Sequence, residues 1–403
     1  MLFIIAWRNL WRNRTRSVLI ASSVALGMWA GLFIMAIYFG MGDSRLRIAI
    51  DNEHSHIQIH HPRFADDFEA QYSLPFDSLN RILQQKPEVK AFSLRSLTTG
   101  MVATASGSQG IQVNGINPGA EQATRGLAAF VTEGEYLDTE RRHPVLVSTK
   151  LAEKMKLKTG GKVVLTLLDT ASNMTSGAFR ICGLYRTTNA PMDELNVFVQ
   201  KDDLDQLIGT SGRLHEAAVL LHRDDALDPV FHRLQRQWKG YRIERWQEIS
   251  PETALVLSSL DTYSIIFIAI ILVALSFGII NTMLMAVLER TPEIGVLMAV
   301  GMNRWRVFRM VVWETVLLAV TGAPAGLLAA WITVAWLHHT GIDLGGIMGD
   351  TLRNFGYASI IYPILPWHNV LQTMELVLLT AAIAAMFPAF KALRLKPVEA
   401  IRK

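Results

Sequence analysis

Four histidines lie within eight residues of one another, at positions 54, 56, 60 and 61. If this segment forms a strand, His54, His56 and His60 project from the same face, and imidazole nitrogens are good ligands for zinc. A polar strand face in contact with water explains the same spacing, with Gln58 completing the row. We favour this second interpretation and predict no metal site.

Two carboxylates, Glu314 and Glu375, interrupt otherwise apolar segments. An acid within a bilayer is a candidate for a proton relay, because an unpaired charge is costly there. Each acid, however, falls only about five to eight residues inside the expected end of its segment. A side chain at that depth reaches headgroups or water, so we expect both acids at the membrane interface.

The sequence contains none of the common catalytic motifs. A nucleotide-hydrolysing loop ends in Gly-Lys-Ser/Thr, and the glycines near 107–110 and 159–163 stand in no such context. Neither H-E-x-x-H nor G-x-S-x-G occurs, and the single cysteine, Cys182, excludes a disulfide framework. We therefore predict a non-catalytic chain that needs no cofactor.

The composition points to a membrane protein. Of the 403 residues, 50% are hydrophobic and 18% are charged, whereas soluble domains carry about 25% charged residues. Segments 18–42 and 262–288 contain no charge and exceed the roughly 20 residues that cross a bilayer. Segments 310–337 and 367–390 are nearly as apolar, which gives four expected spans.

Basic residues predict the orientation of these spans, because Lys and Arg collect on the cytoplasmic side. They concentrate in the N-terminal tail, the 289–309 loop and the tail from 391 to 403, whereas the 338–366 loop has only Arg353. We expect both termini in the cytoplasm and the large 43–261 segment outside it. The basic pI therefore reflects membrane orientation, and no nucleic-acid partner is predicted.

The 43–261 segment reads as a folded α+β domain. Its ends predict a strand at 54–60, a helix at 76–85, a helix at 227–238 and a strand at 241–246. The middle, about 111–200, is rich in strand patterns and holds one short helix, 148–155. We predict a β-rich insertion within an α+β frame, with residues 43–52 and 251–263 continuing the first two spans as helical stalks.

Two pairs of glycines at four-residue spacing predict close helix contacts: Gly27 with Gly31, and Gly322 with Gly326. Small residues at this spacing let another helix approach closely. Because such pairs are common by chance, they predict packing against a helix and nothing more.

Two cytoplasmic segments look amphipathic. Residues 1–16 place aromatic residues on one helical face and arginines on another, as in a helix that lies in the membrane interface. In the 289–309 loop, Thr291 is expected to cap a short helix, with Pro292 at its first position and Gly301 after its end. Its apolar residues Ile294, Leu297 and Met298 are expected to dock on a partner protein or on the ends of the chain's own spans.

Three stretches resemble the FtsX-like, MacB-type permeases of ABC transporters: residues 6–16, 289–304 and 388–402. The order of one span, a large outer domain and three spans is also similar, closest in type to the lipoprotein-releasing, LolC/LolE-like permeases. The resemblance implies porter-like and sabre-like parts in the outer domain, and pairing with a second permease copy or a paralogue. It also implies a separate cytoplasmic ABC ATPase subunit that docks on a coupling helix formed by Glu293, Ile294, Gly295, Leu297, Met298, Gly301 and Arg304.

The function implied by this resemblance is mechanical. We expect ATP hydrolysis in the partner subunit to move the outer domain and release lipoproteins, or another amphiphile, from the outer leaflet of a bacterial inner membrane to a periplasmic carrier. Two alternatives stay open: MacB-like efflux of peptides or drugs with a partner pump, and FtsX-like activation of a cell-wall hydrolase.

Overall fold

The chain forms two compact units. The computed structural model describes residues 7, 12, 14–104, 107–137 and 141–393. The helical unit comprises residues 1–42, 258–343 and 360–403, and the sheet unit comprises residues 43–257 and 344–359.

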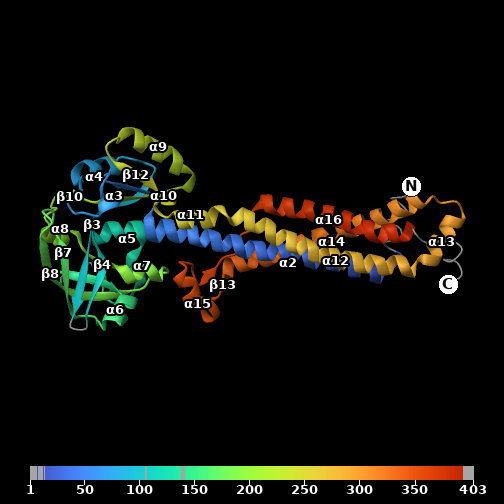
Figure 1. Cartoon of the computed structure of the whole chain (residues 1–403), viewed down its shortest axis with the longest axis horizontal. Helices are drawn as coiled ribbons and strands as arrows, with labels where there is room; N and C mark the ends of the chain where they lie inside the picture. Colours follow the sequence, from blue (N-terminus) through green and yellow to red (C-terminus); the bar gives the residue numbers. More distant parts are fainter. Residues whose placement is uncertain (1–6, 8–11, 13, 105–106, 138–140, 394–403) are drawn as a thin grey trace. The chain divides into compact units, whose positions relative to one another are not determined.

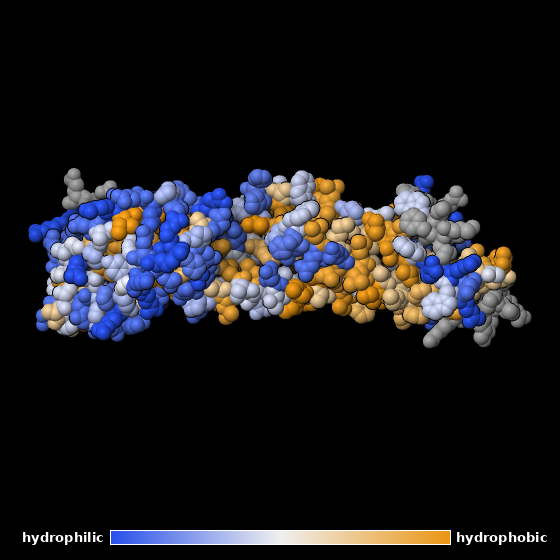
Figure 2. All heavy atoms as spheres, turned by 90° about the horizontal axis from the view of Figure 1, so that it is seen from above, coloured by the Kyte–Doolittle hydropathy of each residue, from blue (hydrophilic) through white to orange (hydrophobic). Residues whose placement is uncertain are grey.

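Four long helices make up most of the helical unit (Figure 1). They are α2 (Arg14–Arg47), α12 (Leu260–Glu289), α14 (Arg304–Thr340) and α16 (Trp367–Leu393), and the short α13 (Thr291–Ala299) lies between two of them in sequence. Figure 2 shows apolar side chains spread over the outside of these helices. All four are long and apolar enough to cross a membrane, which confirms the four predicted spans.

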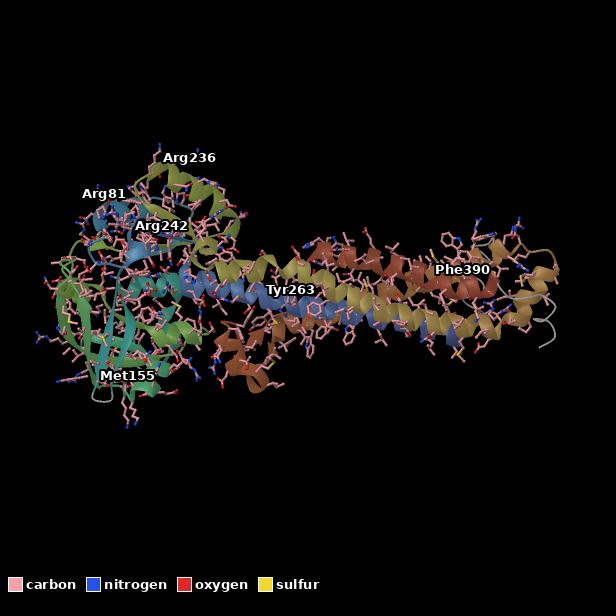
Figure 3. The ribbon with its side chains drawn as sticks, in the orientation of Figure 1. Arg81, Met155, Arg236, Arg242, Tyr263 and Phe390 are labelled. Carbon is pink, nitrogen blue, oxygen red and sulfur yellow. The ribbon has the colours of Figure 1, made fainter. Side chains whose placement is uncertain are left out.

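Alanine, valine and leucine side chains close the core between these helices. Leu32, Ile279, Ala319 and Ala381 are almost fully buried in one apolar cluster. Figure 3 labels Tyr263 on α12 and Phe390 on α16, which lie towards opposite ends of the helical unit. Phe390 packs against Phe308 of α14 at a centroid distance of 5.1 Å.

The first two spans are much longer than a bilayer requires. The π-helix η1 (Ile48–His54) follows α2 directly, and α11 (Pro251–Ser258) precedes α12, so the helical stretches count 38 and 39 residues. About 20 residues cross the hydrocarbon layer. The remaining turns form the two stalks at the predicted positions, with a π-helical segment that the sequence did not predict.

The sheet unit is built on one ten-stranded sheet. The strands pair in the order β3, β4, β9, β6, β8, β7 and back to β3, so these six strands close into a barrel. Three further strands, β11, β1 and β12, extend the sheet outward from β3. Strand β5 pairs with β8. The strands are β1 (Ile57–His60), β3 (Val89–Thr104), β4 (Gly107–Ile116), β5 (Val131–Gly134), β6 (Pro144–Ser148), β7 (Lys162–Leu168), β8 (Met174–Tyr185), β9 (Asn196–Gln200), β11 (Glu216–Leu221) and β12 (Arg242–Arg245). A separate pair joins β2 (Leu74–Pro75) to β10 (Arg213–Leu214).

Helices pack on the apolar side chains of the sheet and bury them. Around β1, β11 and β12 the core includes Leu79 and Leu83 of α4 and Leu234 of α9, and around the barrel it includes Leu151 of α6 and Leu204 of α8. The helices of this unit are α3 (Phe64–Asp67), α4 (Phe76–Gln84), α5 (Pro118–Arg125), α6 (Thr149–Met155), α7 (Ala190–Leu195), α8 (Lys201–Ile208), α9 (Leu227–Gln237) and α10 (Trp246–Ile249), with 3-10 turns η2 (Leu127–Phe130) and η3 (Asp224–Ala226).

The β-rich part starts earlier than the predicted boundary near residue 111. Strand β3 pairs with β11 over residues 89–95 and then with β4 over residues 96–104. A single strand therefore belongs both to the α+β frame and to the barrel, so the insertion is not a separate sheet.

The loop between α14 and α16 has structure of its own. It contains β13 (Ile342–Asp343), α15 (Gly345–Asn354) and β14 (Ile360–Ile361), and β13 pairs with β14. Residues 344–359, including α15, group with the sheet unit.

Candidate functional site

The helix α13 is set by its sequence. Pro292 stands in its first turn with Glu293, where a fixed φ and a negative charge both favour a helix start, and Gly301 adopts φ +102° just after its end. Thr291 does not cap the helix as predicted: the cap position is Arg290, and the Thr291 hydroxyl instead donates to the Leu288 carbonyl at 2.8 Å. The side chain of Thr291, which the sequence predicted as the cap of α13, is therefore hydrogen-bonded to the end of α12 instead.

The two faces of α13 differ from the expected arrangement. Ile294 and Gly295 are buried, Leu297 and Met298 are half-buried, and Met298 packs on the core of the helical unit. The exposed stripe is instead formed by Val296 and Val300, at 51% and 84% exposure, with Ala299 between them. Ile294 and Met298 of the predicted triplet therefore hold α13 against the chain's own spans, and the outward apolar face was missed.

An ion-pair network ties α13 to its neighbours. Glu293 accepts hydrogen bonds from Arg12 at 2.6 Å and from Arg290 at 3.1 Å. Partial desolvation alone would raise the pKa of Glu293. The guanidinium groups of Arg290 and Arg12 have the larger combined effect and hold this pKa below its usual value. The network connects the segment before the first span with the start of α13. Of the predicted interfacial helix, residues 1–6, 8–11 and 13 lie outside the described residues, and residues 14–16 belong to α2.

Glu314 belongs to this network. Its carboxylate is 12% exposed and pairs with Arg290 at 3.0 Å, so one arginine links α14 to the start of α13. Glu375 is different, since it lies on the exposed side of α16. The two acids that looked equivalent in the sequence therefore have different environments.

The glycine pairs contact different helices. A Cβ on Gly322 or Gly326 of α14 would lie 2.5 Å from the Ala21 carbonyl oxygen or 2.4 Å from that of Ala25, both on α2. Gly27 and Gly31 of α2 face side chains of α12 instead, at 3.0 and 3.5 Å from the added Cβ. Backbone-to-backbone contact thus occurs only at the α14 pair among these four glycines.

Comparison with known families decides the type of protein. The family model of the MacB-like periplasmic core domain matches residues 17–237, more than half of the chain, and that of the FtsX-like permease C-terminal region matches residues 265–397. The chain is an ABC transporter permease of the MacB/FtsX/LolE type. This confirms the resemblance seen in the sequence.

Individual relatives of the permease are distant. An uncharacterized ABC transporter permease of Methanocaldococcus jannaschii is 20% identical over 98% of this chain and 96% of its own length. The lipoprotein-releasing transmembrane protein LolE of Haemophilus influenzae is 20% identical over 81% of this chain and 80% of its own. The macrolide export protein MacB of Sodalis glossinidius is 32% identical, but over only 36% of this chain and 20% of its own.

Solved structures of related outer domains are similar only in part. The periplasmic region of MacB from Actinobacillus actinomycetemcomitans is 14% identical and covers 51% of the permease and 94% of that chain, with a TM-score of 0.36. The family models together with the four spans make the permease a multi-pass membrane protein with an extracytoplasmic domain.

The stalks of the permease meet at Arg45. This buried arginine pairs with Glu53 of η1 at 3.1 Å and donates to the hydroxyl of Thr253 in α11 at 2.8 Å. Asn189, the N-cap residue of α7, also donates to Glu53 at 2.7 Å. The guanidinium group of Arg45 thus joins the two stalks to each other. The carboxylate of Glu53 joins the stalks to the start of α7 in the sheet unit.

A second buried ion cluster lies deeper in the sheet unit. Arg95 of β3 donates to both carboxylate oxygens of Glu121 at 2.9 Å and also binds Glu216. Burial alone would raise the pKa of both acids, but Arg95 holds each pKa below its usual value. The cluster connects β3, β11 and α5, and sequence reasoning did not detect it.

The histidines do not share a strand face. His54 lies in η1, and His60 of β1 hydrogen-bonds Gln58. His56 accepts from the Leu221 amide and contacts Asp224 at 3.0 Å. Within residues 14–104, 107–137 and 141–393, no three His, Cys, Asp or Glu residues are grouped so that they could hold a metal ion.

We expect a pH dependence from His54. Burial lowers its folded-state pKa to about 4, against an ordinary value of 6.5. Between these values the unfolded chain binds a proton that the folded chain does not, so stability falls as the pH drops from about 6.5 towards 4. The loss should reach about 2–3 kcal/mol.

Thermal unfolding of the full chain in nanodiscs at pH 7 and pH 5 measures this effect. His54→Phe should narrow the difference between the two melting temperatures. The exposed His232 provides the control, because His232→Phe should leave that difference unchanged. An equal pH dependence in wild type and His54→Phe would contradict the assignment.

Proposed function

We propose that this permease converts ATP hydrolysis by a separate cytoplasmic ATPase subunit, itself a dimer, into movement of its extracytoplasmic domain. The observation that carries the proposal is the exposed apolar stripe of α13, formed by Val296, Ala299 and Val300. A short helix held on one side by its own spans and apolar on the other is suited to docking in a groove of a partner. The basic residues around it favour a cytoplasmic position, with both termini on the same side.

The long stalks support mechanical transmission. Helices α11 and α12 follow one another with only Ser259 between them, and the 39 residues of this stretch are about 58 Å long at 1.5 Å per residue. The Glu293–Arg290–Glu314 pairs join α13 to α14, and Arg45 joins the stalks to each other. Displacement of α13 would therefore reach the extracytoplasmic domain without substrate crossing the bilayer. The second permease subunit, identical or a paralogue, would supply the opposing domain.

We further propose that the cargo is a lipoprotein or another amphiphile, released from the outer leaflet of the inner membrane to a periplasmic carrier. LolE, whose name denotes lipoprotein release, aligns with most of this chain, whereas the macrolide exporter MacB of Sodalis glossinidius aligns with about a third of it. Export of a peptide or drug, as the MacB name suggests for that relative, is the alternative outcome.

The coupling proposal is tested by isolating the tagged permease from membranes of its source organism. We expect a subunit with a Gly-x-x-x-x-Gly-Lys-Ser/Thr loop to copurify and the complex to hydrolyse ATP. Val300→Asp should weaken the complex about 30-fold or more, because an unpaired buried charge costs at least about 2 kcal/mol. The matched control is Met174→Asp in β8, at an apolar residue that is similarly exposed (78%) and has no part in α13.

Two results would contradict the coupling proposal: ATP hydrolysis by the purified permease alone, or undiminished copurification of the ATPase with Val300→Asp. Cargo is tested separately with the reconstituted complex. ATP-dependent transfer of an acylated protein from proteoliposomes to a soluble acceptor supports lipoprotein release, and ATP-dependent uptake of a water-soluble peptide into inverted vesicles supports export instead.

A further inference from the structure

The helix α15 in the loop between the last two spans has no role in the function proposed above. It begins at Gly345, with four residues between it and the end of α14 at Thr340, and α16 begins at Trp367. A four-residue connection spans at most about 14 Å when fully extended. Chain length alone therefore keeps the start of α15 close to the membrane surface at which α14 ends.

One side of α15 exposes large apolar side chains. Ile347 and Phe355 are 85% and 70% exposed, and Met348 between them is 46% exposed. Ile347 lies just before a kink at Met348 (φ −135°, ψ 15°), and Phe355 is the C-cap residue of the helix, so their exposure, rather than helical spacing, places both side chains on the outward side. Such apolar exposure is unfavourable in water and marks a surface that another phase or molecule covers.

The opposite side of α15 packs on the sheet unit. Leu352 is buried, α15 contacts α7, and Gly356 just after the helix adopts φ +72°. A Cβ on Gly356 would lie 3.3 Å from the guanidinium carbon of Arg45. The helix is thus fixed beside the residue that joins the two stalks, with its apolar face left uncovered by its own unit.

The aromatic residues near the ends of the adjoining spans indicate what covers this face. Trp336 near the end of α14 and Trp367 at the start of α16 are 65% and 70% exposed. Tryptophan gathers where hydrocarbon meets headgroups. The apolar face of α15 therefore belongs to a chain segment tethered at both ends to the lipid interface.

We propose that α15 is an interfacial helix whose Ile347, Met348 and Phe355 side chains insert into the extracytoplasmic leaflet. Helices with an apolar face lie in the interface in this manner. Insertion holds the stalk junction at Arg45 next to the lipid surface. The inference concerns the lipid contact of α15 and is independent of the cargo and of the ATPase partner.

Site-directed spin labelling tests the proposal in the full-length permease. The native Cys182 is buried, and burial raises its pKa to about 11, so unmodified protein serves as the background control for labelling. Single cysteines are introduced as Ile347→Cys, Phe355→Cys and Asp350→Cys, the last as the control because its charged side chain is 87% exposed and pairs with Arg353. The labelled proteins are placed in phosphatidylcholine and phosphatidylglycerol nanodiscs.

The readout is the collision rate of each label with oxygen and with a water-soluble nickel chelate. At 347 and 355 we expect oxygen collisions to exceed nickel collisions at least about threefold, and at 350 the reverse. Nickel access at 347 and 355 equal to that at 350 would overturn the proposal, because the face would then lie in water. Exclusion of both reagents would also overturn it and indicate a protein cover. If a variant fails to fold, Met348→Cys replaces it on the same face.

Discussion

Arg95→Met is expected to destabilise the sheet unit by about 3–5 kcal/mol, because it removes the closest counter-charge of two buried carboxylates. Arg95 is 1% exposed, Glu121 is fully buried and Glu216 is 6% exposed. Arg95 satisfies both oxygens of Glu121 and also binds Glu216. Among the described residues, Ser93 still donates to Glu121 at 2.6 Å and Arg125 stays 3.5 Å from it, but neither replaces the bonds that Arg95 makes to Glu121 and Glu216. Calorimetry of the full chain in detergent measures the loss as a lower unfolding temperature.

A matched control is available on the surface. Arg223 pairs with Asp225, but its side chain is 77% exposed, and exposed pairs contribute about 0–1 kcal/mol. Arg223→Met should therefore change the unfolding temperature little. Replacing the four buried charges together, as Arg95→Met, Arg125→Met, Glu121→Leu and Glu216→Met, should recover much of the loss, because Arg125 pairs with Glu121 and would otherwise be left unpaired. Equal melting temperatures for Arg95→Met and Arg223→Met would refute the role of the cluster.

Gly326→Ala is expected to destabilise the helical unit by about 1–3 kcal/mol, the usual effect of overpacking. The added methyl group would lie 2.4 Å from the Ala25 carbonyl oxygen and 2.8 Å from the Met28 Cβ. Both atoms are fixed by the helix α2, so no side-chain rotation relieves the clash. Helices α2 and α14 must therefore move apart, which loses contacts along their whole interface.

Unfolding by SDS in mixed micelles measures the effect of this substitution. Gly278→Ala in α12 is the matched control, because a methyl group there meets nothing within 4 Å. That variant should be neutral or slightly stabilised, since alanine favours a helix more than glycine does. If Gly326→Ala unfolds at the same SDS fraction as Gly278→Ala, the close approach of α2 and α14 is wrong.

Hydropathy alone predicted the four spans, because a long uncharged segment has few alternatives to a membrane helix. In the sheet unit, the strand-rich middle predicted at about 111–200 contains β7, whose side chains alternate between buried and less buried positions. Strand β3 was missed for a physical reason. Ser93, Arg95, Ser96 and Thr98 are buried in it, so polar residues occupy core positions and the apolar alternation that signals a strand is lost.

At the candidate site, the sequence predicted where α13 lies but not which of its faces is free. Ile294 and Met298 look like docking residues when the helix is considered alone, whereas in the structure they pack against the chain's own helices. Periodicity identifies an apolar face and does not say what covers it. The ion pairs of Glu293 and Glu314 likewise join residues distant in sequence, which no local pattern reveals.

The closed ring of six strands has a consequence for secretion and aggregation. A polypeptide that folds after export emerges among many unfolded neighbours, and an open sheet edge would recruit them by backbone pairing. Because the barrel is closed, its six strands leave no open edge for such pairing. The strand at one end of the sheet, β12, carries Arg242, Glu244 and Arg245. Charges at such an edge repel incoming strands. Variation among relatives is therefore expected to preserve these charges even where the bound molecules differ.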